Sequence, residues 1–533
     1  MKEASSSNEK RRIMKDQFGG KPWIKIISPK ISPPSLKDNT ADVDRLIKGI
    51  KKTLQTERIS VDFSLAKNLP QTLRKCDYDV DAAIFEDQNG WHLIDIFPAH
   101  KENRIHGMAV DLGSSTVVAR LVDLSSQEIR DEISFHNPQV QIGTDILTRI
   151  HFAAQEGGLE ELQTLLVERL NNEIHLLTKK HHINTSSIVA ISVAGNTTMT
   201  HLFLGLDPYW ICREPYIPVI NKPDQIRSKE LGLEVNPEAP VLVFPNVGSY
   251  FGGDLIAGIL ASGMMGRHAP SILVDVGTNA EVVVGNSDWL MACAGAAGPA
   301  LEGGVAHMGM MAGPGVIDHV RIGPHSGQFT IRTIGNNPAV GICGSGLIDL
   351  IAELFLAGMI DERGKYVIRK CGDRLMEIDD IKHLVIVPPE NSKTGHALTL
   401  SQPDIDALMR SKAAMYTILT TITNTVNVPM HEVSRFYIAG TFGSFIDPQS
   451  AITIGMLPDL PLKTYIPLGN TSLEGATMAL LSAEAREDIF RIRDQTTYLE
   501  LNVNQEFMNA FSAAKFIPHT DRSLFPSVKV RAS

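Results

Sequence analysis

The fold of this chain is decided by the stretch "MAVDLGSSTVVARLVDL", residues 108–124. An apolar run ends at Asp111, and a second apolar run begins as soon as the turn is complete. The turn itself holds one glycine and a set of hydroxyl residues, namely Gly113, Ser114, Ser115 and Thr116. This pattern predicts a tight β-hairpin with a carboxylate at the end of its first strand.

The same pattern recurs as "ILVDVGTNAEVVVGNSD", residues 272–288. Here the carboxylate is Asp275, and the turn consists of Gly277, Thr278 and Asn279. A single copy would be read as an ordinary β-hairpin. Two copies in matched strand contexts predict two related lobes, each built around one hairpin.

Both hairpins suit phosphate binding. Backbone N–H groups in a tight Gly-Ser/Thr turn converge into an anion-binding nest, and Gly113 and Gly277 remove the side chain that would hinder approach. A carboxylate beside a phosphate makes sense if Asp111 and Asp275 hold Mg²⁺ through water. We therefore expect the hairpins to bind the β- and γ-phosphates of ATP. No P-loop sequence occurs in the chain.

A third glycine-rich turn, in "FYIAGTFGSF" (residues 436–445), follows a predicted strand. Its residues can lie against an adenine and ribose, so the nucleoside-binding candidates are Gly440, Thr441, Phe442 and Gly443. Lys412 is added to the nucleotide-binding candidates.

The order of these elements resembles the superfamily of actin, sugar kinases and heat-shock chaperone ATPases. The resemblance implies an α/β fold with two ribonuclease H-like lobes around an ATP cleft. It also implies a catalytic carboxylate at Asp254, in "FPNVGSYFGGDLIAGILASG" (residues 244–263), that orients the attacking water. An acid that merely favours the first turn of a helix is the other interpretation of Asp254.

The predicted domain organisation has three parts. Residues 1–20 form a flexible tail, residues 21–105 a small α/β linker or middle domain, and residues 106–533 the ATPase domain. Within that domain we expect lobe I at about 106–245 and 435–533, and lobe II at about 246–434.

Further segments narrow the resemblance to one family, the reductive activators of corrinoid proteins. The segments are "NPQVQIGTDILTRI" (137–150), "GNTTMTHLFLGLDP" (195–208), "GGDLIAGIL" (252–260), "AAGPALEGG" (296–304), "GICGSGLIDLIAELFLAGMID" (341–361), "AGTFGSFIDPQSAITIGMLPD" (439–459) and "LGNTSLEGA" (468–476). The resemblance implies ATP-dependent reduction of an inactive Co(II) corrinoid protein to the Co(I) state that accepts methyl groups. A small-molecule kinase and a nucleotide-switched binding protein on the same fold are the alternatives.

Electron supply is where the sequence departs from that family. Well-known members carry a ferredoxin-type iron–sulfur domain, whereas the five cysteines here are scattered and include no C-x-x-C pair. We therefore expect a separate low-potential electron donor and no iron–sulfur cluster.

One segment, in contrast, favours an iron–sulfur cluster. "CAGAAGPALE" (293–302) resembles a segment of 2-hydroxyacyl-CoA dehydratase activators, which implies a homodimer sharing a cluster through Cys293 and Cys343. Buried packing is the commoner role for such cysteines, and the oligomeric state stays open.

Several protein classes are excluded by composition. The formal net charge of −10 argues against nucleic acid as the main partner. The N-terminus lacks the apolar stretch of a secretory signal, and no apolar run reaches the ~20 residues that a membrane helix needs. The sequence predicts a cytoplasmic protein that does not associate with membranes.

Overall fold

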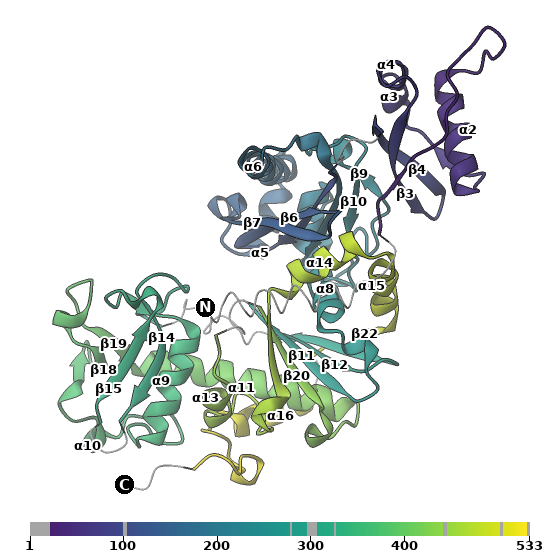
Figure 1. Ribbon diagram of the computed structural model, residues 1–533. Coiled ribbons are helices and arrows are strands. Elements are labelled where there is room, and N and C mark those ends of the chain that lie inside the picture. Colours follow the sequence, from purple (N-terminus) through teal and green to yellow (C-terminus); the bar gives the residue numbers. More distant parts are fainter. Residues whose placement is uncertain are drawn as a thin grey trace. The chain divides into compact units, whose positions relative to one another are not determined.

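The computed structural model describes residues 22–99, 104–277, 280–295, 306–323, 327–440, 445–501 and 505–529 (Figure 1). The chain divides into two compact units. Unit 1 comprises residues 1–261 and 472–494, and unit 2 comprises residues 262–471 and 495–533. The predicted tail, residues 1–20, lies outside the described residues. In the part of the chain that is described, no helix is both long and apolar enough to cross a bilayer.

Unit 1 begins with a four-stranded sheet in the order β1-β3-β4-β2. Its strands and helices are β1 (Lys25–Ile27), α2 (Asp42–Leu54), β2 (Ile59–Ser60), α3 (Phe63–Ala66), α4 (Leu69–Lys75), β3 (Val80–Asp87) and β4 (Gly90–Pro98). Helix α2 has acids in its first turn and lysines in its last, which suits the helix dipole. Its buried residues Leu46 and Ile50 belong to the core that the sheet forms with α4.

The larger sheet of unit 1 has six strands in the order β7-β6-β5-β8-β10-β9. The strands are β5 (His106–Leu112), β6 (Thr116–Asp123), β7 (Glu128–His136), β8 (Ile188–Gly195), β9 (Ile226–Arg227) and β10 (Pro240–Val243). Strands β5, β6 and β7 form an antiparallel meander. Strand β8 then pairs with β5 in parallel, and β10 pairs with β8 in parallel. The helices that share its core are α5 (Ile146–Ala153), α6 (Gly158–Lys180) and α7 (Thr197–Leu204).

The main sheet of unit 2 repeats this pattern. Its order is β21-β20-β11-β12-β13-β22, with an antiparallel meander of β11, β12 and β13 and parallel strands β20 and β21 beside β11. The strands are β11 (Ser271–Val276), β12 (Ala280–Gly285), β13 (Leu290–Gly295), β20 (Arg435–Ala439), β21 (Tyr465–Gly469) and β22 (Thr496–Tyr498). Each predicted hairpin therefore opens the same arrangement of five strands, as two related lobes require.

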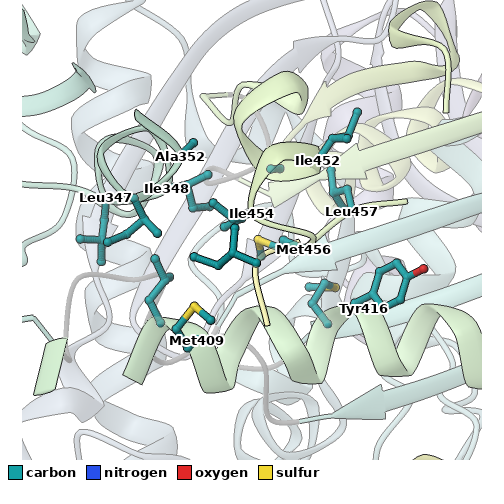
Figure 2. Packing of buried hydrophobic residues seen from close by; sticks show 14 of the residues in the cluster. Leu347, Ile348, Ala352, Met409, Tyr416, Ile452, Ile454, Met456 and Leu457 are labelled. Atoms are coloured by element: carbon teal, nitrogen blue, oxygen red, sulfur yellow. The ribbon is translucent and has the colours of Figure 1, made fainter. Parts of the chain in front are cut away.

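Two three-stranded sheets and several helices complete unit 2. They are β14 (Val316–Ile322), β15 (Phe329–Thr333), β16 (Gly341–Ile342), α9 (Gly344–Leu356), α10 (Ile368–Cys371), β17 (Leu375–Ile378), β18 (Ile381–Val387), β19 (Leu398–Ser401), α11 (Gln402–Thr425), α13 (Pro448–Thr453) and α16 (Gln505–Ala514). Figure 2 shows how side chains of α9, α11 and residues 452–457 pack into one core. Helix α11 begins with a capping box in which Ser401 and Asp404 bond each other's backbone N–H groups at 3.2 and 2.8 Å.

The lobe boundaries differ from the predicted ones. Residues 435–471 and 495–533 belong to unit 2, not to the lobe of the first hairpin, because β20 pairs along its whole length with β11. Residues 246–261 belong instead to unit 1. The prediction placed the third glycine-rich turn with the wrong hairpin.

Helix α8 (Gly253–Ser262), which carries Asp254, packs against α14 (Thr471–Leu481) of unit 1, and α15 (Ala483–Gln495) follows. The contact is very close at one point. A Cβ atom on Gly475 would lie only 2.4 Å from the Ala257 carbonyl oxygen. The backbones of α8 and α14 can touch here because Gly475 has no side chain.

We expect Gly475→Ala to push α8 and α14 apart. Overpacking of this kind costs about 1–3 kcal/mol, so thermal unfolding should begin at a lower temperature than in the parent protein. Gly266→Ala is the matched control, because nothing lies within 4 Å of a Cβ atom built on Gly266. Equal melting temperatures for both variants would show that the contact tolerates a methyl group.

Candidate functional site

The hairpin of unit 1 turns between the end of β5 and the start of β6 at Thr116. A Cβ atom on Gly113 would lie 2.2 Å from the Thr116 carbonyl oxygen, closer than any side chain allows. The turn therefore needs glycine at this position for steric reasons alone. Ser115 is exposed, and Ser114 is half-buried.

The carbonyl groups of Gly113, Ser114 and Ser115 all accept hydrogen bonds from one segment, residues 137–149. The Asn137 side chain donates to the Gly113 oxygen at 2.9 Å, and its backbone N–H donates to the Ser115 oxygen at 2.9 Å. The Arg149 guanidinium donates to the Ser114 oxygen at 2.6 Å. Both side chains are buried, with 1% of Asn137 and 0% of Arg149 exposed.

This anchoring fixes the direction of the turn's N–H groups. In a trans peptide the C=O and N–H bonds point in opposite directions. Since the carbonyls of Gly113 and Ser114 point toward residues 137–149, the N–H groups of Ser114 and Ser115 point away from them. Within the described chain no partner is found for these two N–H groups. They are therefore available to an anion, as the nest interpretation requires.

A pair of carboxylates lies near this turn. Asp111 is the second-last residue of β5, in register with Ala194 of β8, and Asp254 is the second residue of α8. Burial, and to a smaller extent the charge of Asp111, raise the pKa of Asp254 to about 6. Asp254 Oδ1 also accepts a hydrogen bond from the Leu255 N–H at 2.9 Å.

The start of α8 is held close to the end of β8. A Cβ atom on Gly252 would lie 2.5 Å from the Cα atom of Asn196, which follows β8 and caps α7 through a 2.9 Å bond from the Met199 N–H. The structure thus brings Asp111 and Asp254 together at one edge of the sheet. A half-buried carboxyl group with a pKa near neutrality can take up a proton or orient a water molecule.

Unit 2 brings Asp275 close to Gly440, the first residue of the third glycine-rich segment. Asp275 lies on β11 in register with Ala439 of β20, and Gly440 follows directly. A Cβ atom on Gly440, whose φ is +82°, would lie 2.8 Å from the Asp275 Oδ1 atom. Gly277 is described and half-buried. The other predicted residues of these turns, Thr278, Asn279, Thr441, Phe442 and Gly443, lie outside the described residues.

Lys412 has a structural position. Its side chain, on α11, is 0% exposed, and its ammonium donates to the carbonyl of Phe516 and, at 2.8 Å, to that of Pro518. Burial holds the pKa of Lys412 well below its ordinary value. The placement contradicts the predicted nucleotide-binding role, because an enclosed amine that already bonds two carbonyls cannot also reach a phosphate. It fastens the C-terminal segment to α11.

The two cysteines considered for a cluster are both buried. Cys293 lies on β13, where burial raises the pKa of its thiol. Cys343 precedes α9, and its sulfur contacts the Ile317 carbonyl at 3.3 Å and the Ser345 hydroxyl at 3.2 Å. The raised pKa of Cys293 disfavours the thiolate that would bind iron. Among the described residues no group of three or more His, Cys, Asp or Glu side chains is arranged to hold a metal.

Sequence reasoning missed Asn137 and Arg149. Both lie in the segment quoted for the family resemblance, but nothing in the sequence shows what they bond, because their partners are main-chain carbonyls 24 and 35 residues earlier. Asn196, which follows β8 and caps α7, was not predicted either.

Models of known protein families match nearly the whole length of the chain. Three family models of RACo proteins match successive segments: the linker region at residues 15–103, the middle region at 106–267, and the C-terminal ASKHA domain at 269–529. The ASKHA fold is that of actin, sugar kinases and heat-shock chaperones. The predicted fold class is confirmed.

Named relatives agree with these matches. The chain is 31% identical over 484 residues to "Corrinoid activation enzyme RamQ" of Eubacterium limosum, covering 89% of this chain and 79% of the relative. It is 23% identical over 441 residues to "[Co(II) methylated amine-specific corrinoid protein] reductase" of Methanosarcina barkeri, covering 76% of each chain.

A solved structure, "Reductive activator for corrinoid,iron-sulfur protein", superposes with a TM-score of 0.85 at 38% identity. The match covers 96% of this chain and 81% of that one. The resemblance drawn from the sequence is confirmed, and the chain belongs to the RACo family, the reductive activators of corrinoid proteins.

Proposed function

We propose that this chain binds Mg-ATP and uses its binding and hydrolysis to support the one-electron reduction of Co(II) to Co(I) in a partner corrinoid protein. One observation carries the proposal. In a chain 31% identical to the corrinoid activation enzyme RamQ over 484 residues, each unit contains a hairpin with a carboxylate near the end of its first strand, set in the same five-strand pattern.

The proposed nucleotide contacts follow from the geometry of each unit. In unit 1, the N–H groups of Ser114 and Ser115 donate to phosphate oxygens. In unit 2, the turn that begins at Gly440 receives the nucleoside. Asp111 of unit 1 and Asp275 of unit 2 are each proposed to hold Mg²⁺ through its water shell, because the ion keeps most of its waters when it binds. Bound there, Mg²⁺ would offset the charge that develops on the phosphates.

Hydrolysis is assigned to Asp254. Its ionised form accepts a hydrogen bond from the attacking water and aligns it with the terminal phosphorus atom. The reaction consumes ATP and water and yields ADP and inorganic phosphate. The low polarity around the carboxyl group, which raises its pKa, also makes it a better proton acceptor near neutral pH.

The need for ATP is energetic. The Co(II)/Co(I) couple of corrinoids has a very low potential, and each ~59 mV of deficit reduces a one-electron equilibrium tenfold. An activator that binds the corrinoid protein differently in its nucleotide states can shift that equilibrium, by no more than the difference in binding free energy.

The electron itself is proposed to come from a separate low-potential donor. The positions of the thiols support this. Cys293 is enclosed in the core of unit 2, and the thiols of Cys343 and Cys371 contact backbone carbonyls at 3.3 Å. These are the environments of packing cysteines.

The Mg-ATP assignment can be tested by calorimetry. Asp275→Ala should weaken Mg-ATP binding about tenfold or more, because it removes a carboxylate that holds the hydrated ion. The matched control is Asp318→Ala, which removes an acid of unit 2 that pairs with Arg332 at 2.8 Å. Equal affinity in the parent protein and Asp275→Ala would contradict the assignment.

Asp254→Asn should retain Mg-ATP binding and lose turnover. The same variant should be more stable than the parent protein when both are free of ligand in EDTA at pH 7.5. The pKa of Asp254 is raised from 3.8 to about 6, so the folded state binds more protons than the unfolded state between these values. Stability therefore falls as the pH rises through this window, and the penalty persists above it.

Melting temperatures measured from pH 4 to pH 8 check this sign. The stabilisation by Asp254→Asn should shrink as the pH falls toward 4, where the parent carboxyl group is protonated in the folded state and about half protonated in the unfolded state. A variant that gains nothing at pH 7.5, or that hydrolyses ATP at the parent rate, contradicts the role given to Asp254.

The proposed function is tested by reduction of a Co(II) corrinoid protein from the same organism, with a low-potential chemical reductant as electron source. We expect the Co(I) absorption spectrum to develop only when this chain, ATP and reductant are all present, and the Co(II) protein to stimulate ATP hydrolysis. Asp254→Asn serves as the hydrolysis control. Co(I) formation at the same rate without ATP, or without the chain, would refute the function.

A further inference from the structure

Arg149 is a buried cation whose hydrogen-bond partners are all neutral. Besides the Ser114 carbonyl, it donates to the Gly143 carbonyl at 2.9 Å and approaches Gln139 Oε1 at 3.4 Å and Met199 Sδ at 3.3 Å. Asp145 is the carboxylate whose charge acts on it, but Asp145 is exposed and caps α5 by accepting from the Thr148 N–H at 2.9 Å.

Arg45, the other buried arginine in the described part of unit 1, has an anionic partner, because it pairs with Asp38 at 2.5 Å. Arg120, which is partly buried, pairs with Glu474 at 2.7 Å. A buried charge without such a partner is costly, and buried charges in proteins are accordingly paired. Among the described residues no carboxylate forms an ion pair with Arg149, so a bound anion could compensate its positive charge.

The phosphate-binding turn lies directly on the guanidinium. Arg149 bonds the Ser114 carbonyl, and the N–H at the other end of that same peptide group belongs to Ser115. A hydrogen bond to a carbonyl polarises its peptide group and strengthens the N–H as a donor. The positive charge of Arg149 therefore strengthens the Ser115 N–H as a donor on the side of the turn where an anion would bind.

From this arrangement we propose that Arg149 is a positioning residue for ATP: through the Ser114–Ser115 peptide it supplies the positive charge that favours a triphosphate over a diphosphate at the turn of unit 1. Asn137 shares the mechanical part of the role by holding the Gly113 carbonyl, but it adds no charge. The inference rests on the proposed nucleotide function and names which of its residues distinguishes ATP from ADP.

The test is calorimetric titration of the full chain with Mg-ATP and with Mg-ADP at one pH and salt concentration. Arg149→Met removes the charge and keeps most of the volume, so Mg-ATP affinity should fall about ten- to a hundredfold and Mg-ADP affinity by clearly less. Arg149→Lys keeps a charge but loses the fork that reaches two carbonyls, so it should lose less ATP affinity than Arg149→Met.

Arg130→Met is the matched control. Arg130 lies on β7 of the same sheet and pairs with Asp123, at the end of β6 that is remote from the turn. This variant should bind both nucleotides as the parent protein does. Circular dichroism of each ligand-free variant verifies that it is folded.

Mg-ATP affinity within twofold of the parent value in Arg149→Met would overturn the proposal. Equal losses for Mg-ATP and Mg-ADP would also overturn it, because a purely structural role predicts them. If Arg149→Met does not fold, the ratio of the two affinities in Arg149→Lys decides, and an unchanged ratio refutes the proposal. A parent protein that binds neither nucleotide would refute the proposed function and this inference together.

Discussion

Three consecutive carbonyl groups, those of Gly113, Ser114 and Ser115, accept hydrogen bonds from residues 137–149, and the account of unit 1 depends on this anchoring. A tight turn has no ladder partners of its own, and buried backbone groups must be bonded somewhere. Here one face of the turn is satisfied by a buried amide and a buried guanidinium. The opposite face presents N–H groups. The orientation of these donors is thus set before any ligand arrives, which suits the anion-binding role proposed for the hairpin.

The duplicated sheet explains where the other polar groups lie. In both units a carboxylate occupies the second-last position of the first strand, beside a parallel strand that ends at the same edge: Asp111 beside β8, and Asp275 beside β20. Each unit then adds its own element at that edge. Unit 1 adds α8 with Asp254, held close to α14 at Gly475. Unit 2 adds Gly440, which directly follows β20 and lies close to Asp275. Burial makes the ionised form of Asp254 less favourable than it is in water, and this raises the pKa of its carboxyl group. Carboxyl groups with such shifted pKa values are typical of functional sites.

The hairpins and the two-lobed α/β fold could be expected from the sequence, because local patterns and a family resemblance indicate them. Three features could not. Lys412 and the segment it binds are about 100 residues apart, and nothing local distinguishes a buried lysine from a ligand-binding one. The assignment of β20 to the second lobe depends on strand pairing across more than 150 residues. Asn137 and Arg149 act on main-chain carbonyls, which have no signature in the sequence of the turn they hold.

Amide hydrogen exchange of the full chain, with and without Mg-ATP, tests the central claim most directly. The account predicts that the N–H groups of Ser114 and Ser115 exchange fast in the free protein and become strongly protected when Mg-ATP binds. The backbone N–H of Asn137, already bonded to the Ser115 carbonyl, should be protected in both states. Binding of Mg-ATP that leaves the exchange of Ser114 and Ser115 unchanged would contradict the account, since the anchored turn would then present its donors to no phosphate.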